Sequence, residues 1–155
     1  MRTRSSRWAR VCLCGSLLVA ASVHLLLVGD HAEESPLLGV GFVAAGILQV
    51  GLASMVTLTR ARLPYCLVIG LNVSLIGVYA VHVLVGLPLS NSPDGSLALG
   101  PRENIDLIGA VGKIAELAGI VLALGLLRSP DGRTAEFPRA PGPARSQESS
   151  ATGPT

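Results

Sequence analysis

Hydrophobic and polar positions divide this chain into four long apolar runs with charged residues between and beyond them. The runs cover about residues 11–28, 37–58, 64–85 and 105–127. At a rise of about 1.5 Å per residue, each run is long enough to cross a hydrocarbon core of about 30 Å as a helix. The pattern therefore predicts an all-α fold, a four-helix transmembrane bundle.

The segments outside the runs complete the domain organisation. Residues 1–10 form a basic N-terminus, 11–127 the membrane domain, and 128–155 a tail dominated by Pro, Gly, Ser, Ala and Arg. This tail is predicted to be disordered, because its composition buries too little apolar surface to offset the entropy of ordering. The N-terminus resembles a signal peptide, but its apolar run is long and lacks a small-x-small cleavage site. We expect an uncleaved first helix.

Arginine positions predict the orientation in the membrane. The connectors at 29–36 and 86–104 carry only Arg102 against five acidic residues, whereas the other segments are arginine-rich. The arginines of those segments are Arg2, Arg4, Arg7, Arg10, Arg60, Arg62, Arg128, Arg133, Arg139 and Arg145. By the positive-inside rule, both termini are expected to be cytoplasmic in a multi-pass protein of the cell membrane.

Composition indicates the kind of partner. Half of the residues are hydrophobic and 14% are charged, which excludes an ordinary soluble domain and makes the lipid bilayer the expected environment. The net charge is only +2, and the arginines flank apolar runs without interleaved aromatics, so no nucleic-acid partner is expected. Gly39, Gly46 and Ala53 recur at a spacing of seven, which permits close helix approach and suggests a homo-oligomer or a partner membrane protein.

Polar side chains from three of the runs are predicted to share a central layer. Counting from the outer ends places Gln49 roughly 18 Å deep, Asn72 about 20 Å, Glu116 about 16 Å and Lys113 about 12 Å. Lys113 and Glu116 are three residues apart and share a helix face. Each ionised side chain at the centre of a span costs roughly 2.5–3.5 kcal/mol, so this helix depends on partners from its neighbours.

Two interpretations of this layer remain open. In the first, Lys113 and Glu116 form a structural ion pair, satisfied by Gln49 and Asn72, that fixes the helix register. In the second, the two ionisable residues serve a proton- or ion-coupled carrier, because such residues inside membranes often mark pathways for ions or protons.

A second polar layer is predicted near the extracytoplasmic surface. Its members are His24, His31, Glu34, His82, Glu103 and Asp106. We expect a hydrogen-bonded network here, with His24 bonded to Asp106 or Tyr79. The alternative is a metal- or haem-binding protein through His24, His31 and His82, because imidazoles with carboxylates suit transition metals and paired histidines can ligate haem. No local ligand motif such as His-x-x-x-His occurs, so the leading expectation is no cofactor.

The sequence gives little support to catalysis. It has no Gly-x-Ser-x-Gly elbow, and Cys12, Cys14 and Cys66 are predicted at the cytoplasmic side, away from the histidines. We expect no catalytic residue and no enzyme. The leading hypothesis is a small integral membrane protein with a structural, accessory or sensory role.

Several polar landmarks together are similar to those of a known family. They are Asp30-His31-Ala32-Glu33-Glu34-Ser35-Pro36-Leu37-Leu38-Gly39, Gly41-Phe42, Gly46-Ile47-Leu48-Gln49, Asn72, His82, Gly86-Leu87-Pro88, Glu103, Asp106 and Glu116. Over about residues 20–120 the chain resembles an uncharacterised family of small four-span bacterial integral membrane proteins with no assigned function. Relatives often carry an arginine before the Gly-Leu-Pro turn, which this chain lacks. The resemblance implies four spans and a membrane location and adds no chemistry.

Overall fold

The computed structural model describes residues 2–59, 61–85, 90–91, 97–98 and 106–129. Its helices are α1 (Arg2–Leu26), α2 (Val28–Glu34), α3 (Pro36–Leu58), α4 (Leu63–Leu84) and α5 (Leu107–Arg128). Two short strands, β1 (Ser90–Asn91) and β2 (Leu97–Ala98), pair antiparallel. The predicted disordered tail lies, from residue 130 onward, outside the described residues, as does Glu103.

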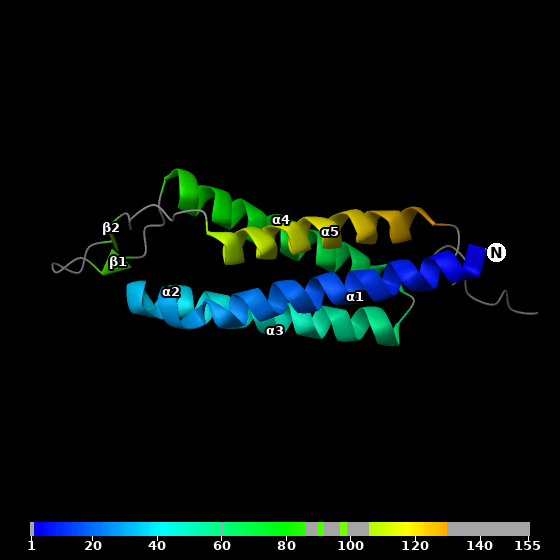
Figure 1. Ribbon diagram of the computed structural model, residues 1–155, viewed down its shortest axis with the longest axis horizontal. Coiled ribbons are helices and arrows are strands. Elements are labelled where there is room, and N and C mark those ends of the chain that lie inside the picture. Colours follow the sequence, from blue (N-terminus) through cyan, green and yellow to red (C-terminus); the bar gives the residue numbers. More distant parts are fainter. Residues whose placement is uncertain (1, 60, 86–89, 92–96, 99–105, 130–155) are drawn as a thin grey trace, which may run out of the picture.

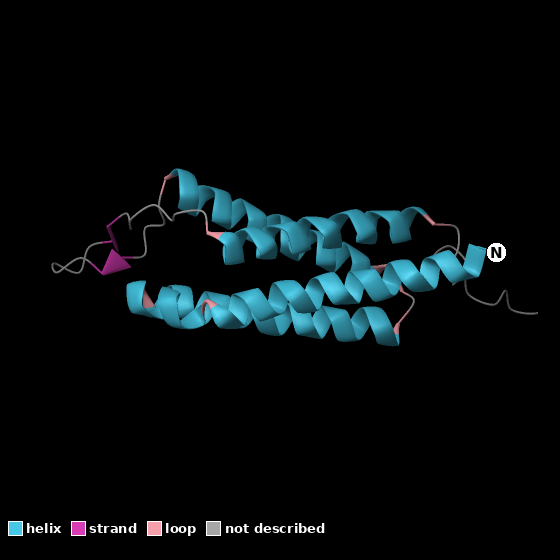
Figure 2. Ribbon diagram, in the orientation of Figure 1, coloured by secondary structure: helices cyan, strands magenta, loops and turns pink. Residues whose placement is uncertain are grey.

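The predicted all-α bundle of four long helices is confirmed. α1, α3, α4 and α5 run lengthwise beside one another, and each is long and apolar enough to cross a membrane (Figure 1). α1 is already helical from Arg2, so the helix extends through the basic segment that precedes the first apolar run. Helices account for nearly all of the described chain, with short loops between them (Figure 2).

The first connector, predicted at 29–36, is itself mostly the short helix α2. The chain bends at Leu27, whose backbone stays helical at φ −86° and ψ 0°. Backbone hydrogen bonds from Leu27 N to Val23 O and from His31 N to Leu27 O continue the ladder through the bend. Helix-favouring residues such as Ala32, Glu33 and Glu34 sustain α2 until the extended Ser35, after which Pro36 begins α3.

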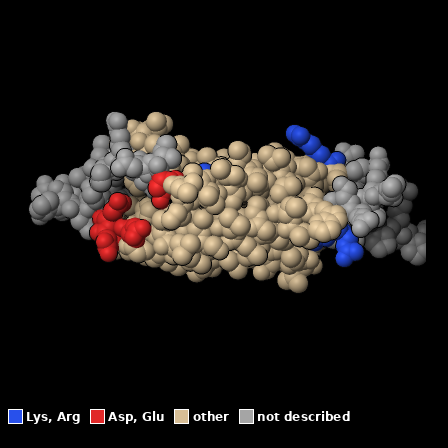
Figure 3. All heavy atoms as spheres, in the orientation of Figure 1, with Lys and Arg blue, Asp and Glu red and all other residues tan. Residues whose placement is uncertain are grey.

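Apart from Lys113 and Glu116 in the middle of α5, the charged side chains of the described residues lie mainly at the two ends of the bundle. Asp30, Glu33 and Glu34 of α2 gather at one end, which we call the acidic end, whereas lysine and arginine side chains project mainly at the other, the basic end (Figure 3). Between them the surface is predominantly apolar. Val40, Ile47 and Ile114 are each more than 60% exposed there.

A compact apolar core fills the half of the bundle toward the basic end. Its members come from all four long helices and are Leu13, Leu17, Leu52, Ala53, Val56, Tyr65, Val68, Ala123 and Leu126. α1 lies between α3 and α5 and packs extensively on both, whereas α4 packs mainly on α5 and much less on α3. The core therefore holds α4 against α3 chiefly toward the basic end.

The Arg10 side chain ties the start of α1 to the end of α3. Its guanidinium donates to the backbone oxygens of Val56 and Thr59, the latter at 2.7 Å. The last carbonyls of a helix have no partner within it and carry the negative end of the helix dipole. The Arg10 guanidinium supplies hydrogen-bond donors to these carbonyls and places a positive charge at the negative end of the dipole.

The small residues predicted to allow close helix approach do so within the chain. A Cβ added to Gly39 would lie 2.7 Å from the Ala32 Cβ of α2, and one added to Gly46 would lie 2.8 Å from Leu25 Cγ of α1. Ala53 is buried on the same side of α3. These positions are occupied by intramolecular packing, so a homo-oligomer would have to use another face.

This packing predicts that Gly39→Ala destabilises the bundle. The new methyl group meets Ala32, including its Cα at 3.0 Å, so α2 must shift, and overpacking of this kind costs about 1–3 kcal/mol. Gly51→Ala is the matched control in the same helix, because a Cβ there meets nothing within 4 Å. Thermal unfolding in detergent should show a lower midpoint for Gly39→Ala and an unchanged or higher one for Gly51→Ala. Equal midpoints would contradict the tight α2–α3 contact.

Candidate functional site

The centre of the candidate site is the carboxylate of Glu116, which is fully buried in the middle of α5. The Lys113 ammonium donates to both carboxylate oxygens, at 2.8 Å each. The His24 Nε2 atom of α1 lies 2.9 Å from Oε1. Because an ionised carboxylate only accepts hydrogen bonds, His24 donates through Nε2–H. One carboxylate thus joins α1 to α5 and binds the lysine one turn earlier.

Two amide side chains extend this arrangement to the other two long helices. Asn72 of α4 donates through Nδ2 to the backbone oxygen of Glu116 at 3.2 Å, and Gln49 of α3 donates through Nε2 to Asn72 Oδ1 at 3.4 Å. Gln49 and Asn72 are fully buried. Gly119 leaves room for this bond, since a Cβ there would lie 2.8 Å from Asn72 Nδ2. We call His24, Gln49, Asn72, Lys113 and Glu116 the polar cluster.

Two buried atoms of the polar cluster have no hydrogen-bond partner among the described residues. They are His24 Nδ1 and Gln49 Oε1. With the proton on Nε2, a neutral His24 carries a lone pair at Nδ1 and is an acceptor there. A buried polar atom without a partner costs about 1–3 kcal/mol, so both atoms mark places where a further polar group would be stabilising.

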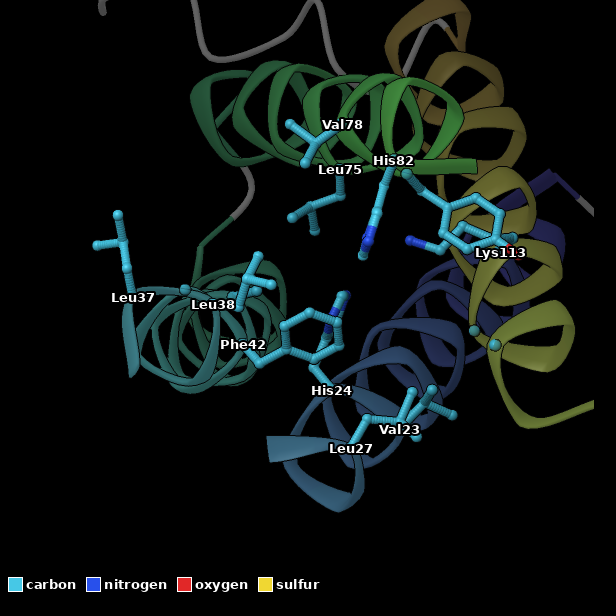
Figure 4. A pocket seen from close by; sticks show the side chains of 15 residues that line it. Val23, His24, Leu27, Leu37, Leu38, Phe42, Leu75, Val78, His82 and Lys113 are labelled. Carbon is cyan, nitrogen blue, oxygen red and sulfur yellow. The ribbon is translucent and has the colours of Figure 1, made fainter. Parts of the chain in front are cut away.

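A cavity of about 410 Å³ adjoins the polar cluster on the side of the acidic end. It lies between the helices, with apolar side chains forming most of its wall, and Figure 4 shows the polar ends of His24, His82 and Lys113 directed into it. The lining residues are Val23, His24, Leu27, Leu37, Leu38, Gly41, Phe42, Ala45, Leu75, Val78, Tyr79, His82, Gly109, Gly112 and Lys113. The Lys113 ammonium also lies 5.1 Å from the centroid of the Tyr79 ring, within the range of a cation–π contact.

Aromatic rings form one side of the cavity. Phe42 stacks on His31 with 3.9 Å between ring centroids and meets His24 edge-on at 5.3 Å. His31 Nδ1 lies 2.9 Å from the Leu27 backbone oxygen, to which it donates. The His31 and His82 ring centroids are 6.4 Å apart. The sequence offered one signal for Phe42, which is the lone aromatic within the second apolar run, but it served only as a landmark of the family resemblance.

The structure brings Gln49, Asn72, Lys113 and Glu116 together, as the depth count predicted, and adds His24 to them. The expected partners of His24, Asp106 and Tyr79, were wrong, because its hydrogen bond goes to Glu116. Since helical structure continues into α2 beyond the end of α1, distance from that end was a poor measure of depth. Gln49 and Asn72 also do not bind the Lys113–Glu116 ion pair directly. They bind each other and the backbone of Glu116.

The other residues of the predicted outer layer have separate environments. Asp106 caps α5, its side chain accepting from Gly109 N at 2.6 Å, and Glu34 is exposed at the end of α2. His31 and His82 are buried beside the cavity. Within the described ranges, no three His, Cys, Asp or Glu side chains are placed to hold a metal ion.

No family model, curated protein or solved structure matches this chain. The class of protein is therefore inferred from its sequence and fold. Four long apolar helices with a predominantly apolar exterior, and charges gathered mainly at the two ends, define a multi-pass membrane protein. A buried carboxylate–lysine–histidine arrangement is the feature that distinguishes it from a plain bundle of apolar helices.

The polar cluster predicts a large effect of Glu116→Gln. The amide removes the negative charge that balances Lys113, and breaking a buried ion pair costs about 3–5 kcal/mol. The double variant Lys113→Met/Glu116→Gln removes both charges and should recover much of the loss. Unfolding in mixed detergent micelles measures both, with the exposed Glu34→Gln as a control that should stay within about 0.5 kcal/mol of the parent. If Glu116→Gln were as stable as the parent protein, the Lys113–Glu116 ion pair would not contribute to the stability of the bundle.

Proposed function

We propose that this membrane protein binds a small apolar molecule in the cavity beside the polar cluster, in an accessory or sensory role and without catalysis. The observation that carries the proposal is the cavity of about 410 Å³ with apolar walls and polar side chains at one side. Binding sites for small molecules in proteins have about this size, about 300–1,000 Å³, and this combination of an apolar lining with a few convergent polar groups.

The position of the cavity supports a ligand that arrives through the lipid. Leu37 of α3 and Val78 of α4 line the cavity and are also 61% and 53% exposed on the bundle surface. The cavity therefore reaches the exterior near these two helices, which pack weakly on one another. A molecule dissolved in the bilayer can enter sideways without crossing water.

Packing beyond the polar cluster favours binding over transport. A proton- or ion-coupled carrier based on Glu116 and Lys113 would need access from both ends of the bundle. Toward the basic end, however, the polar cluster is followed by the tightly packed apolar core that includes Leu13, Val56 and Val68, each at most 1% exposed. Both carboxylate oxygens of Glu116 are also bonded.

The imidazole contacts favour a cavity wall over a metal or haem site. His24 directs Nε2 to Glu116, and His31 directs Nδ1 to the Leu27 carbonyl. Phe42 packs against both rings. We therefore assign His24 and His31, with the nearby His82, to shaping the cavity and orienting its occupant.

The separation of charges supports an orientation with both termini cytoplasmic. Arg7, Arg10, Arg62 and Arg128 lie at the ends of helices near the basic end, whereas α2 at the acidic end contributes carboxylates. Basic residues are retained on the cytoplasmic side during insertion. In this orientation the cavity occupies the extracytoplasmic half of the membrane.

Single cysteines test this orientation. In a background with Cys12, Cys14 and Cys66 replaced by serine, Glu33→Cys places a thiol on the exposed acidic end and Ala61→Cys places one on the exposed α3–α4 connector. A membrane-impermeant maleimide added to intact cells should label Glu33→Cys and leave Ala61→Cys unlabelled until the membrane is opened. The reverse pattern would invert the proposed topology.

Photolabelling tests the cavity. A small aliphatic diazirine without a hydroxyl group, added to the protein in nanodiscs, should give labelling of the acidic-end halves of α3 and α4 that saturates and is displaced by unlabelled compound. Gly41→Phe should reduce this saturable labelling at least about tenfold by placing a ring in or across the cavity, because Gly41 lines it and has open space at its Cβ. Gly51→Phe is the matched control on α3, equally open but outside the lining, and should leave the labelling unchanged. Labelling that never saturates, or that both variants reduce equally, would refute binding in this cavity.

A further inference from the structure

The polar side of the cavity combines an unsatisfied acceptor with a donor. His24 is 6% exposed and lines the cavity, and its Nδ1 has no hydrogen-bond partner in the described part of the chain. Its Nε2–H is committed to Glu116 at 2.9 Å, so a neutral imidazole presents a lone pair at Nδ1.

Lys113 supplies the donor. An ammonium group has three N–H bonds, and two of them are directed to the Glu116 oxygens. The Lys113 side chain is 21% exposed, whereas Glu116 is fully buried. Figure 4 shows the Lys113 nitrogen, from α5, directed into the cavity toward the His24 and His82 rings, which come from α1 and α4. The remaining N–H is therefore available to an oxygen atom of an occupant, with the Tyr79 ring face beside it.

From these two groups we infer that the molecule in the cavity is a lipid-soluble phenol or alcohol whose hydroxyl donates to His24 Nδ1 and accepts from Lys113. A hydroxyl group carries one O–H donor and two acceptor lone pairs, so it can do both at once. The inference rests on the proposed function and adds the chemical class of the ligand. The apolar body of the molecule would lie between α3 and α4, against Leu38, Phe42 and Leu75.

Other polar groups match the His24 Nδ1 acceptor and the Lys113 donor less well than a hydroxyl group does. An ether or ketone oxygen accepts from Lys113 but leaves His24 Nδ1 unpaired. A carboxylate has no donor for Nδ1 and brings a second negative charge close to Glu116. An ammonium group could donate to Nδ1 but is repelled by Lys113. Leaving a buried acceptor unpaired costs about 1–3 kcal/mol, which allows a site to discriminate against an analogue that lacks one hydroxyl.

The test compares 4-octylphenol with its methyl ether, 4-octylanisole, as competitors of the photolabelling described above. The two share an apolar body and differ only in the hydroxyl hydrogen, which the ether replaces with a methyl group. On the parent protein in nanodiscs, the phenol should compete roughly tenfold more strongly than the anisole. His24→Gln is the informative variant, because a glutamine amide can still donate to Glu116 from the position of Nε2 but has no acceptor at the position of Nδ1.

In His24→Gln the ratio of the two potencies should fall to about one. Comparing ratios cancels the different partitioning of phenol and ether into lipid. Thermal unfolding of the variant confirms that the bundle is intact, and Gly51→Phe, on α3 and outside the cavity lining, should keep the ratio of the parent protein. A ratio near one on the parent protein would overturn the inference while the cavity still binds, as would a ratio that survives in His24→Gln. Absence of saturable labelling on the parent would instead refute the proposed function.

Discussion

The buried carboxylate of Glu116 is the constraint on which the rest of this bundle depends. A charge in the middle of an apolar helix is tolerated only where neighbours neutralise and hydrogen-bond it. Here Lys113 supplies the charge, His24 supplies a donor from α1, and Asn72 fixes the adjacent backbone from α4. Because Gln49 joins through Asn72, one set of bonds sets the axial register of all four long helices.

The polar cluster also divides the bundle into two unlike halves. Toward the basic end the helices converge on a dense core, and Arg10 closes that half by capping α3. Toward the acidic end α4 packs on α5 more than on α3, and the space left between α3 and α4 forms the cavity. The polar cluster therefore bounds the packed core on one side and forms the polar wall of the proposed binding site on the other. Structural and ligand-binding roles for the ionisable residues are compatible in this arrangement.

Sequence patterning was sufficient for the architecture and for part of the site. Apolar runs gave the four long helices, and counting along each run placed Gln49, Asn72, Lys113 and Glu116 at one level, because rise per residue in a helix is nearly constant. The count failed for His24 because it began from a helix end that is not a surface: α2 extends beyond it. The cavity was beyond prediction, since it depends on how far α4 leans from α3 and on rotamers such as that of Phe42. No linear pattern encodes either quantity.

The bend at Leu27 connects the wall of the cavity to the short helix α2. Leu27 lines the cavity, its carbonyl accepts from the His31 ring, and backbone hydrogen bonds of its own N–H and carbonyl join it to Val23 and to His31 of α2. α2 has seven residues and is about 10 Å long, and it carries three exposed carboxylates at the acidic end. A rotation of a few degrees at the bend would displace those carboxylates by about half an ångström or more. The shape of the cavity and the position of the carboxylates at the acidic end are therefore linked through the backbone at Leu27.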